Sequence, residues 1–228
     1  MPLGPDRLKV LRDFASEFGP SRGVVQEVRE FQHQQSFGPG GEVLSSSATS
    51  SVIGYESWNE ARDFRLQVTL SSINASWLGS YPGGDEVLRV LLEKWPLFLD
   101  RTAPQQVTRL AIRIVNRLVK PWNTIESVCG DFRTWNALPE MGTPRLPLLH
   151  FHRMGVPGSI PVQVQLGQIL EEPRGTSPLT VILDVDAWSD GNWTANDLPL
   201  SSLFQQVRDG KNQAFFASFT KGADAWLR

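Results

Sequence analysis

The sequence is poor in the residues that most often carry disulfides, metal sites and redox chemistry. Its 228 residues include one cysteine, Cys129, and three histidines. A single cysteine excludes a disulfide within the chain and is typical of proteins from a reducing compartment. The cysteine count therefore predicts a cytoplasmic protein.

Long apolar runs are also missing. A membrane-spanning helix needs about 20 consecutive apolar residues, and no uninterrupted apolar stretch of this chain approaches that length. The first residues, MPLGPDRLKVLRDF, are divided by charges and lack the apolar core of a secretory signal. The sequence thus again favours cytoplasmic localisation, and we expect no membrane partner.

A strong excess of charge of either sign is absent. The chain has 22 Lys and Arg against 24 Asp and Glu, which gives a formal net charge of -2. No overall field recruits nucleic acid, so any such binding requires a local patch. With 40% hydrophobic and 20% charged residues, the composition is globular and suffices for one large core or two small ones.

The common catalytic motifs are not found. The chain contains no Gly-x-Ser-x-Gly sequence and no phosphate-binding glycine loop, and no His-rich segment accompanies Cys129. We expect no catalytic residues and no cofactor, which favours a protein that is not an enzyme. A metal-dependent hydrolase remains as a third hypothesis, because Asp184 and Asp186 offer hard oxygen ligands and His150 and His152 have a spacing that zinc can use.

The hydrophobic pattern that is present alternates between strand and helix periods. Apolar residues at helical spacing predict helices over 6–18, 81–100, 123–132 and 197–220. Alternating residues predict strands over 23–35, 50–58, 63–70, 73–78, 107–119, 145–154, 160–170 and 178–188. The Gly/Ser-rich stretch 36–51 between the first two strands is predicted to be a loop.

These elements form a faint internal repeat. Each half contains a strand, a strand that ends in Trp, a turn and an amphipathic helix, with Trp77 and Trp188 at equivalent points. The pattern predicts an α+β protein with two similar halves, 1–104 and 105–228, that share an antiparallel or mixed sheet with helices packed on one face. Both tryptophans are expected to be buried under the helix that follows them.

Three arginines share one face of the strand 107–119. Arg109, Arg113 and Arg117 alternate with apolar residues that line the opposite face. Because a central strand buries both faces, and a buried guanidinium needs a carboxylate, we predict that Arg113 or Arg117 pairs with Asp184 or Asp186. The alternative is an anion site on the same residues, to which Asn116 also belongs, that grips a phosphate or an acidic peptide.

Several motifs resemble a sporadically distributed prokaryotic family of uncharacterised proteins. VTRLAIRIVNRL, LTVILDVDAW and KNQAFFASFT are similar to its Thr-Arg-Leu-Ala-x-Arg-x-x-Asn-Arg strand, its Leu-Asp-x-Asp strand and its Asn-x-x-Phe-Phe-x-Ser helix. GYESW and YPGG also resemble its equivalents, so the resemblance covers nearly the whole chain. The resemblance supplies no established catalytic activity to carry over to this chain, and the family's patchy distribution suits a defence, toxin–antitoxin or mobile-element locus. We expect an accessory or immunity-type protein that acts through protein contacts, with a nucleic-acid-binding or phosphate-binding module as the alternative.

The chain departs from the family at its start. Family members usually begin with an apolar strand, whereas this chain begins at the first helix. The absent strand is the counterpart of 107–119, so its loss is expected to leave an open sheet edge at FRLQVTL in the N-terminal half. A protein partner or a second copy of the chain is predicted to cover that edge, unless the true start lies upstream or Val24–Phe31 closes the gap.

Overall fold

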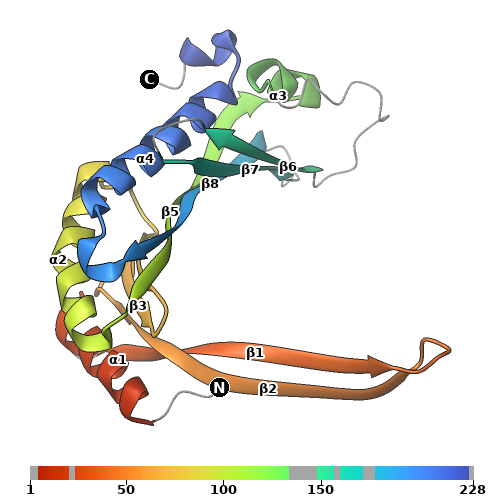
Figure 1. The fold of residues 1–228 in the computed structure, drawn as a ribbon. Coiled ribbons are helices and arrows are strands. Elements are labelled where there is room, and N and C mark those ends of the chain that lie inside the picture. The colour runs from red at the N-terminus through yellow and green to blue at the C-terminus, as the bar shows by residue number, and fades with distance from the viewer. Residues whose placement is uncertain (1–4, 21–23, 134–147, 157–159, 172–177, 226–228) are drawn as a thin grey trace. The chain divides into compact units, whose positions relative to one another are not determined.

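The computed structural model describes residues 5–20, 24–133, 148–156, 160–171 and 178–225. The chain divides into two compact units, Met1–Gln105 (unit 1) and Gln106–Arg228 (unit 2). Each unit contains one antiparallel four-stranded sheet and its own helices (Figure 1), which confirms the predicted α+β class. The expectation of one shared sheet is wrong, because the strands form two separate sheets.

Unit 1 has two helices on one face of its sheet, whose strand order is β1-β2-β3-β4. Its elements are α1 (Pro5–Phe18), β1 (Val25–Phe37), β2 (Val43–Trp58), β3 (Phe64–Thr69), β4 (Ile73–Trp77) and α2 (Gly84–Thr102). Helically spaced residues of α1 and α2 pack against alternate residues of β3 to form a small core of Leu11, Phe14, Ala15, Leu66, Val68 and Phe98. Because this core uses one face of β3, the opposite face of the sheet remains free of the helices.

The segment 36–51 is mostly strand, so the predicted loop is wrong. β2 begins at Val43 and pairs with β1 as far as Ser57, with two irregularities in the register, and only a tight turn at 38–42 separates the two strands. Gly41 has a φ of 84° in this turn, a conformation that glycine adopts at little cost. The two strands form a hairpin, with Phe37 opposite Val43 and Ser36 opposite Ser45. The serine-rich start of β2 lacks the apolar alternation and the β-branched or aromatic residues that mark a strand in the sequence.

The open edge expected at FRLQVTL is also wrong. β3 lies inside the sheet, where it pairs with β2 on one side and with β4 on the other. Among the described strands, β4 pairs only with β3 and β1 pairs only with β2. The edges of the first sheet are therefore β1, β4 and the part of β2 that β3 does not reach.

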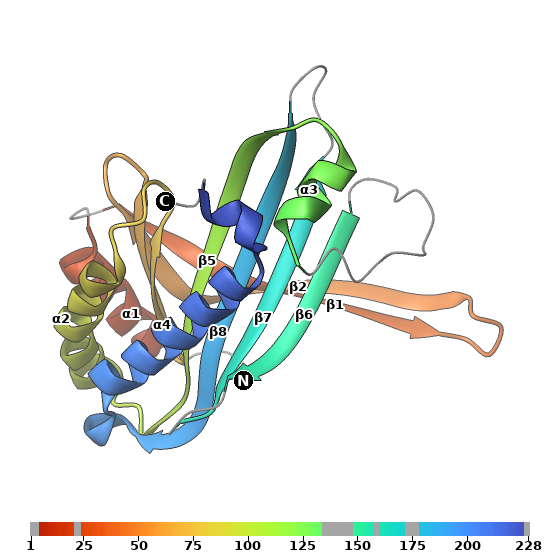
Figure 2. The same cartoon turned by 90° about the horizontal axis from the view of Figure 1, so that it is seen from above.

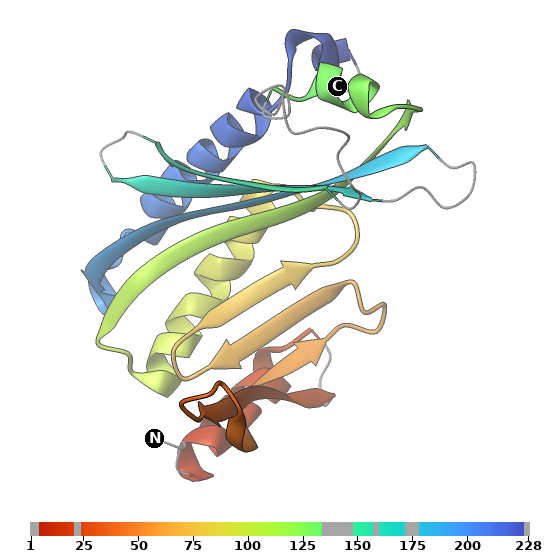
Figure 3. The ribbon, with the colours of Figure 1, turned by 90° about the vertical axis from the view of Figure 1, so that its right-hand side faces the viewer.

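Unit 2 has the strand order β5-β8-β7-β6. Its elements are β5 (Gln106–Trp122), α3 (Ile125–Asp131), β6 (Leu148–Val156), β7 (Val162–Glu171), β8 (Leu179–Thr194), the short 3-10 turn η2 (Ala195–Asp197), α4 (Leu200–Ala217) and η3 (Lys221–Ala225). α4 crosses one face of the sheet (Figures 2 and 3), and its Val207 and Ala214 belong to the same core as alternate residues of β7 and β8. The other residues of each strand point to the opposite face.

Candidate functional site

The polar residues of interest lie on the face of the second sheet that α4 does not cover. In β8 the residues Val181, Leu183, Val185 and Ala187 are buried in the core with α4. Asp184 and Asp186 alternate with them and therefore point the other way. Antiparallel register sets the odd-numbered residues of β5 beside these aspartates, because Arg113 lies opposite Asp186 and Val115 lies opposite Asp184.

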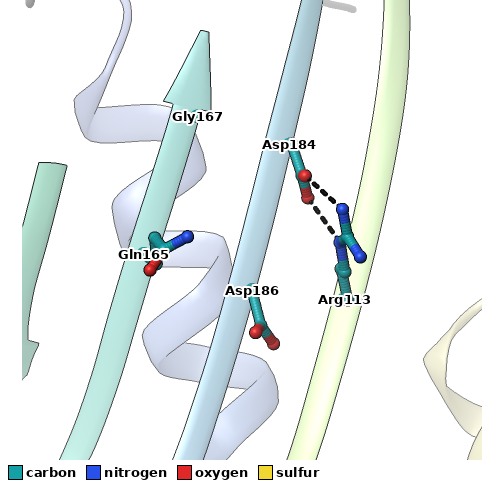
Figure 4. A pocket seen from close by; sticks show the side chains of 5 residues that line it. All are labelled: Arg113, Gln165, Gly167, Asp184 and Asp186. Carbon is teal, nitrogen blue, oxygen red and sulfur yellow. Dashed lines mark hydrogen bonds and ion pairs between the residues drawn. The ribbon is translucent and has the colours of Figure 1, made fainter. Parts of the chain in front are cut away.

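Arg113 and Asp184 form the best-defined contact of this face. Arg113 donates from Nε to Asp184 Oδ1 at 2.9 Å and from an Nη atom to Asp184 Oδ2 at 2.6 Å (Figure 4). This two-point geometry matches the planar guanidinium to the carboxylate. The hydrogen bonds, and then the charge of Asp184, raise the pKa of Arg113 above its usual value. Arg113 is therefore a permanent cation held in one orientation.

The other two arginines also meet carboxylates. Arg109 donates to Asp186 Oδ2 at 3.1 Å, and its guanidinium carbon lies 4.7 Å from the centre of the Trp188 ring. Arg117 donates to Glu171 Oε2 at 3.2 Å from Nε. We call the surface formed by Arg109, Arg113, Arg117, Glu171, Asp184 and Asp186 the arginine face.

Burial of these pairs was expected, and that expectation is wrong. The side chains of Arg109, Arg113 and Arg117 are 48%, 63% and 62% exposed. The reason is topological, since β5 pairs only with β8 among the described strands and is an edge rather than a central strand. An edge strand on an uncovered face leaves long side chains in water, where ion pairs are weak.

A shallow polar hollow of about 150 Å³ lies beside the Arg113–Asp184 pair. Arg113, Gln165, Gly167, Asp184 and Asp186 line it. Gly167 lies opposite Asp184 and Gln165 lies opposite Asp186, so the missing side chain at 167 opens the space (Figure 4). The hollow offers both donors and acceptors to a polar group that enters it.

Some residues predicted for the site lie elsewhere. Asn116 lies opposite Leu183 in the register, so it belongs to the face that carries the core and not to the arginine face. The backbone of His150 lies opposite Gln168 and that of His152 opposite Leu166; the side chains of both histidines are outside the described residues. In the described part of the chain, no three His, Cys, Asp or Glu side chains are grouped so that they could hold a metal ion.

The structure adds two residues that sequence reasoning missed. Glu171, at the end of β7, supplies the third carboxylate, and Trp188 supplies the ring under Arg109.

Trp188 is 6% exposed, as its predicted burial requires, but the register places it opposite Ala111 and Gln163, on the face away from α4. Trp77 is only half-buried, so the prediction of two rings buried under helices fails for both. Because alternate residues of a strand share a face, the sequence already indicated that Trp188 lies on the same face as Asp184 and Asp186.

Comparison with known proteins gives no relative from which a role could be transferred. No family model, no curated protein and no solved structure matches the chain. None of the helices in the described part of the chain combines the length and the apolar character that a membrane span requires.

Proposed function

We propose that the protein is not an enzyme and that it binds another protein through the arginine face of unit 2. The observation that carries this proposal is that each arginine is well exposed and already paired with a carboxylate of its own sheet. A guanidinium has five N–H donors, and Arg113 uses two of them on Asp184, so a partner can accept from this side chain without breaking that pair. Arginine is also a residue that contributes strongly at protein interfaces.

The charge balance of this face favours a protein over a polyanion. The three arginines meet three carboxylates, Glu171, Asp184 and Asp186, so the face has no net charge from these residues. Nucleic-acid binding draws its affinity from uncompensated cations that replace counterions on the phosphates. A surface of alternating charges instead suits a partner with its own charges of both signs.

Apolar side chains on the same strand supply the contact area that charges do not. Val115 and Val119 alternate with the arginines and are 58% and 57% exposed. Exposed valines between paired arginines resemble the mixed composition of a specific protein interface. Together with the resemblance to a sporadically distributed family, this supports an accessory or immunity-type role in a prokaryotic defence, toxin–antitoxin or mobile-element locus.

Co-expression with the products of the flanking genes tests the proposal. A product that co-purifies is titrated by calorimetry against the parent chain, Arg113→Ala and Val115→Asp. We expect both substitutions to weaken binding by at least about tenfold, as for central interface residues. Arg89→Ala is the matched control, because Arg89 on α2 is ion-paired and 61% exposed, much as Arg113 is, and it should change affinity by less than about twofold.

A polynucleotide titration decides the alternative. Labelled single-stranded DNA, duplex DNA and RNA are titrated at several salt concentrations. Tight binding that falls steeply with salt and is lost in Arg109→Gln, Arg113→Gln and Arg117→Gln would replace the proposal with the nucleic-acid module.

A further inference from the structure

The β1–β2 ribbon of unit 1 has a long strand edge with no partner in the structure. Residues 29–37 of β1 and 43–52 of β2, which we call the arm, pair with each other, whereas β3 reaches β2 only from Gly54 to Trp58. Figures 1 and 2 show the arm extending past the end of β3. A two-stranded ribbon is marginally stable in water, so an arm of this length is expected to be stabilised by a further contact.

The two edges of the arm differ in how they are protected. The β1 edge of the arm carries Arg29 and Glu30, and charged side chains on an edge strand discourage pairing with other chains. The β2 edge has no charged residue and no proline from Val43 to Tyr55. Val43 and Leu44 are 55% and 64% exposed at its outer end. The register with β1 is irregular only at Leu44 and Ile53, near the two ends of the arm, so the β2 edge from Ser45 to Ser51 has no charge, proline or bulge that would block strand addition.

Symmetry identifies the partner that this edge fits. A strand can pair antiparallel with its own copy about a two-fold axis normal to the sheet. The residue at the axis then lies opposite the same residue of the copy, and each residue before it lies opposite the residue equally far after it. Such pairing is disfavoured if like charges meet. The run Ser45–Ser51 consists only of Ser, Ala and Thr and is regular in its register with β1. With Ala48 at the axis, every opposed pair in this run is small and uncharged.

We propose that two copies of the chain associate through antiparallel pairing of their β2 edges, centred near Ala48, which makes a four-stranded ribbon β1-β2-β2-β1. The interface lies in unit 1 and does not depend on the arginine face or on the function proposed for it. The small side chains allow close backbone approach but bury little apolar area, so the dimer is expected to form in the micromolar range rather than the nanomolar.

Sedimentation velocity over a dilution series measures the association. The double substitution Ser47→Lys with Thr49→Lys places lysines opposite each other twice across the axis, and should raise the dimer dissociation constant by at least about tenfold. Its control is Gln32→Lys with Gln34→Lys. Gln32 and Gln34 are the cross-strand neighbours of Thr49 and Ser47 on the same face of the arm, so the control adds the same charge on the protected edge. It should change the constant by less than about threefold, and circular dichroism melts show whether both variants fold.

Cross-linking locates the axis. In a Cys129→Ser background, Ala48→Cys brings two thiols within the distance that a disulfide spans, since opposed Cα atoms lie about 4.5–5.5 Å apart. Mild oxidation should link Ala48→Cys chains and leave His33→Cys chains unlinked, because His33 faces Ala48 from the far strand. A parent chain that stays monomeric at all concentrations, a dimer that survives the β2 lysines, or a link at 33 rather than 48 would each overturn the proposal. The proposal would also be overturned if the backbone amides of 45–51 were protected from hydrogen exchange only when a different protein is added.

Discussion

At the scale of single residues, the strength of the Arg113–Asp184 pair depends on its exposure, because water weakens an ion pair. The Arg113–Asp184 contact follows from two strands that each carry charges at alternate positions. Whether such a contact is buried depends on which strands flank it, and the strand order β5-β8-β7-β6 is set by pairing between distant segments that the sequence does not encode locally. The predicted burial of Arg113 is therefore wrong, whereas its predicted pairing with Asp184 is confirmed.

The exposure changes the expected effect of Arg113→Ala on stability. A buried network would lose about 2–4 kcal/mol when one partner is removed. For a pair in which Arg113 is 63% exposed, the free energy of unfolding should fall by less than about 1 kcal/mol. Urea denaturation of the parent and Arg113→Ala chains measures this. A loss of several kcal/mol would show that something else buries this face in solution.

Asp131 is the charged residue whose loss should be costly. Its Oδ2 accepts from Lys120 Nζ at 2.7 Å and from Trp122 Nε1 at 2.6 Å, and Asp131 and Trp122 are 8% and 1% exposed. Asp131→Ala removes the carboxylate that accepts from the indole N–H of the buried Trp122 and from Lys120, so we expect a loss of about 2–4 kcal/mol in the same urea experiment. Trp122→Phe removes the donor as well and keeps an aromatic ring; combined with Asp131→Ala, it should cost less than the two single losses added together.

At the scale of elements, periodicity located the helices and the amphipathic strands and missed the strand that has no apolar face. α1, α2 and α4 bury one stripe each, as their sequences indicate. The first part of β2 buries nothing, since residues 43–51 are all exposed, so burial left no pattern there to read. What specifies this strand is its pairing with β1, which the sequence does not show residue by residue.

Gly54 tests the junction where the arm joins the sheet. It lies opposite Thr69 of β3, and a Cβ at this position would overlap the carbonyl oxygen of Val68. Gly54→Ala should therefore separate β2 from β3 locally and lower the midpoint of thermal unfolding, at a cost of about 1–3 kcal/mol. Gly155→Ala is the control, because a Cβ on this strand glycine meets no atom within 4 Å. Equal melting of the two variants would mean that β2 and β3 are not packed as described.

At the scale of the whole molecule, the two units are variations on one arrangement rather than copies. Unit 2 runs strand, helix, three strands, helix, whereas unit 1 runs helix, four strands, helix. In unit 2 the strand before the last helix is β8, which pairs with both β7 and β5. In unit 1 the corresponding strand is β4, which pairs only with β3 among the described strands. The sequence repeat predicted the shared part. The extra strand β1 lies at the opposite edge of the unit 1 sheet from β4, and the repeat could not indicate its place because it has no counterpart in unit 2.

Among the described residues, each unit has a core of its own, which predicts that unit 2 folds by itself. Its core runs from Trp122 to Ala223 and that of unit 1 from Leu11 to Phe98. A fragment of residues 106–228 should show the circular dichroism of a strand-rich protein and a cooperative melt, because a domain of this size buries roughly two thirds of its extended surface. The backbone amide signals of the fragment in a two-dimensional NMR spectrum should overlay on those of the same residues in the full chain.

The matched control for that fragment is 125–228, which lacks β5. Without β5, one edge of β8 loses its hydrogen-bonding partner, and the buried Trp122 and the apolar face of Leu110, Ile112 and Leu118 are lost from the core. This fragment should therefore aggregate or melt without cooperativity. If 106–228 behaves no better than 125–228, the core of unit 2 requires unit 1, and the two units fold as a single cooperative structure.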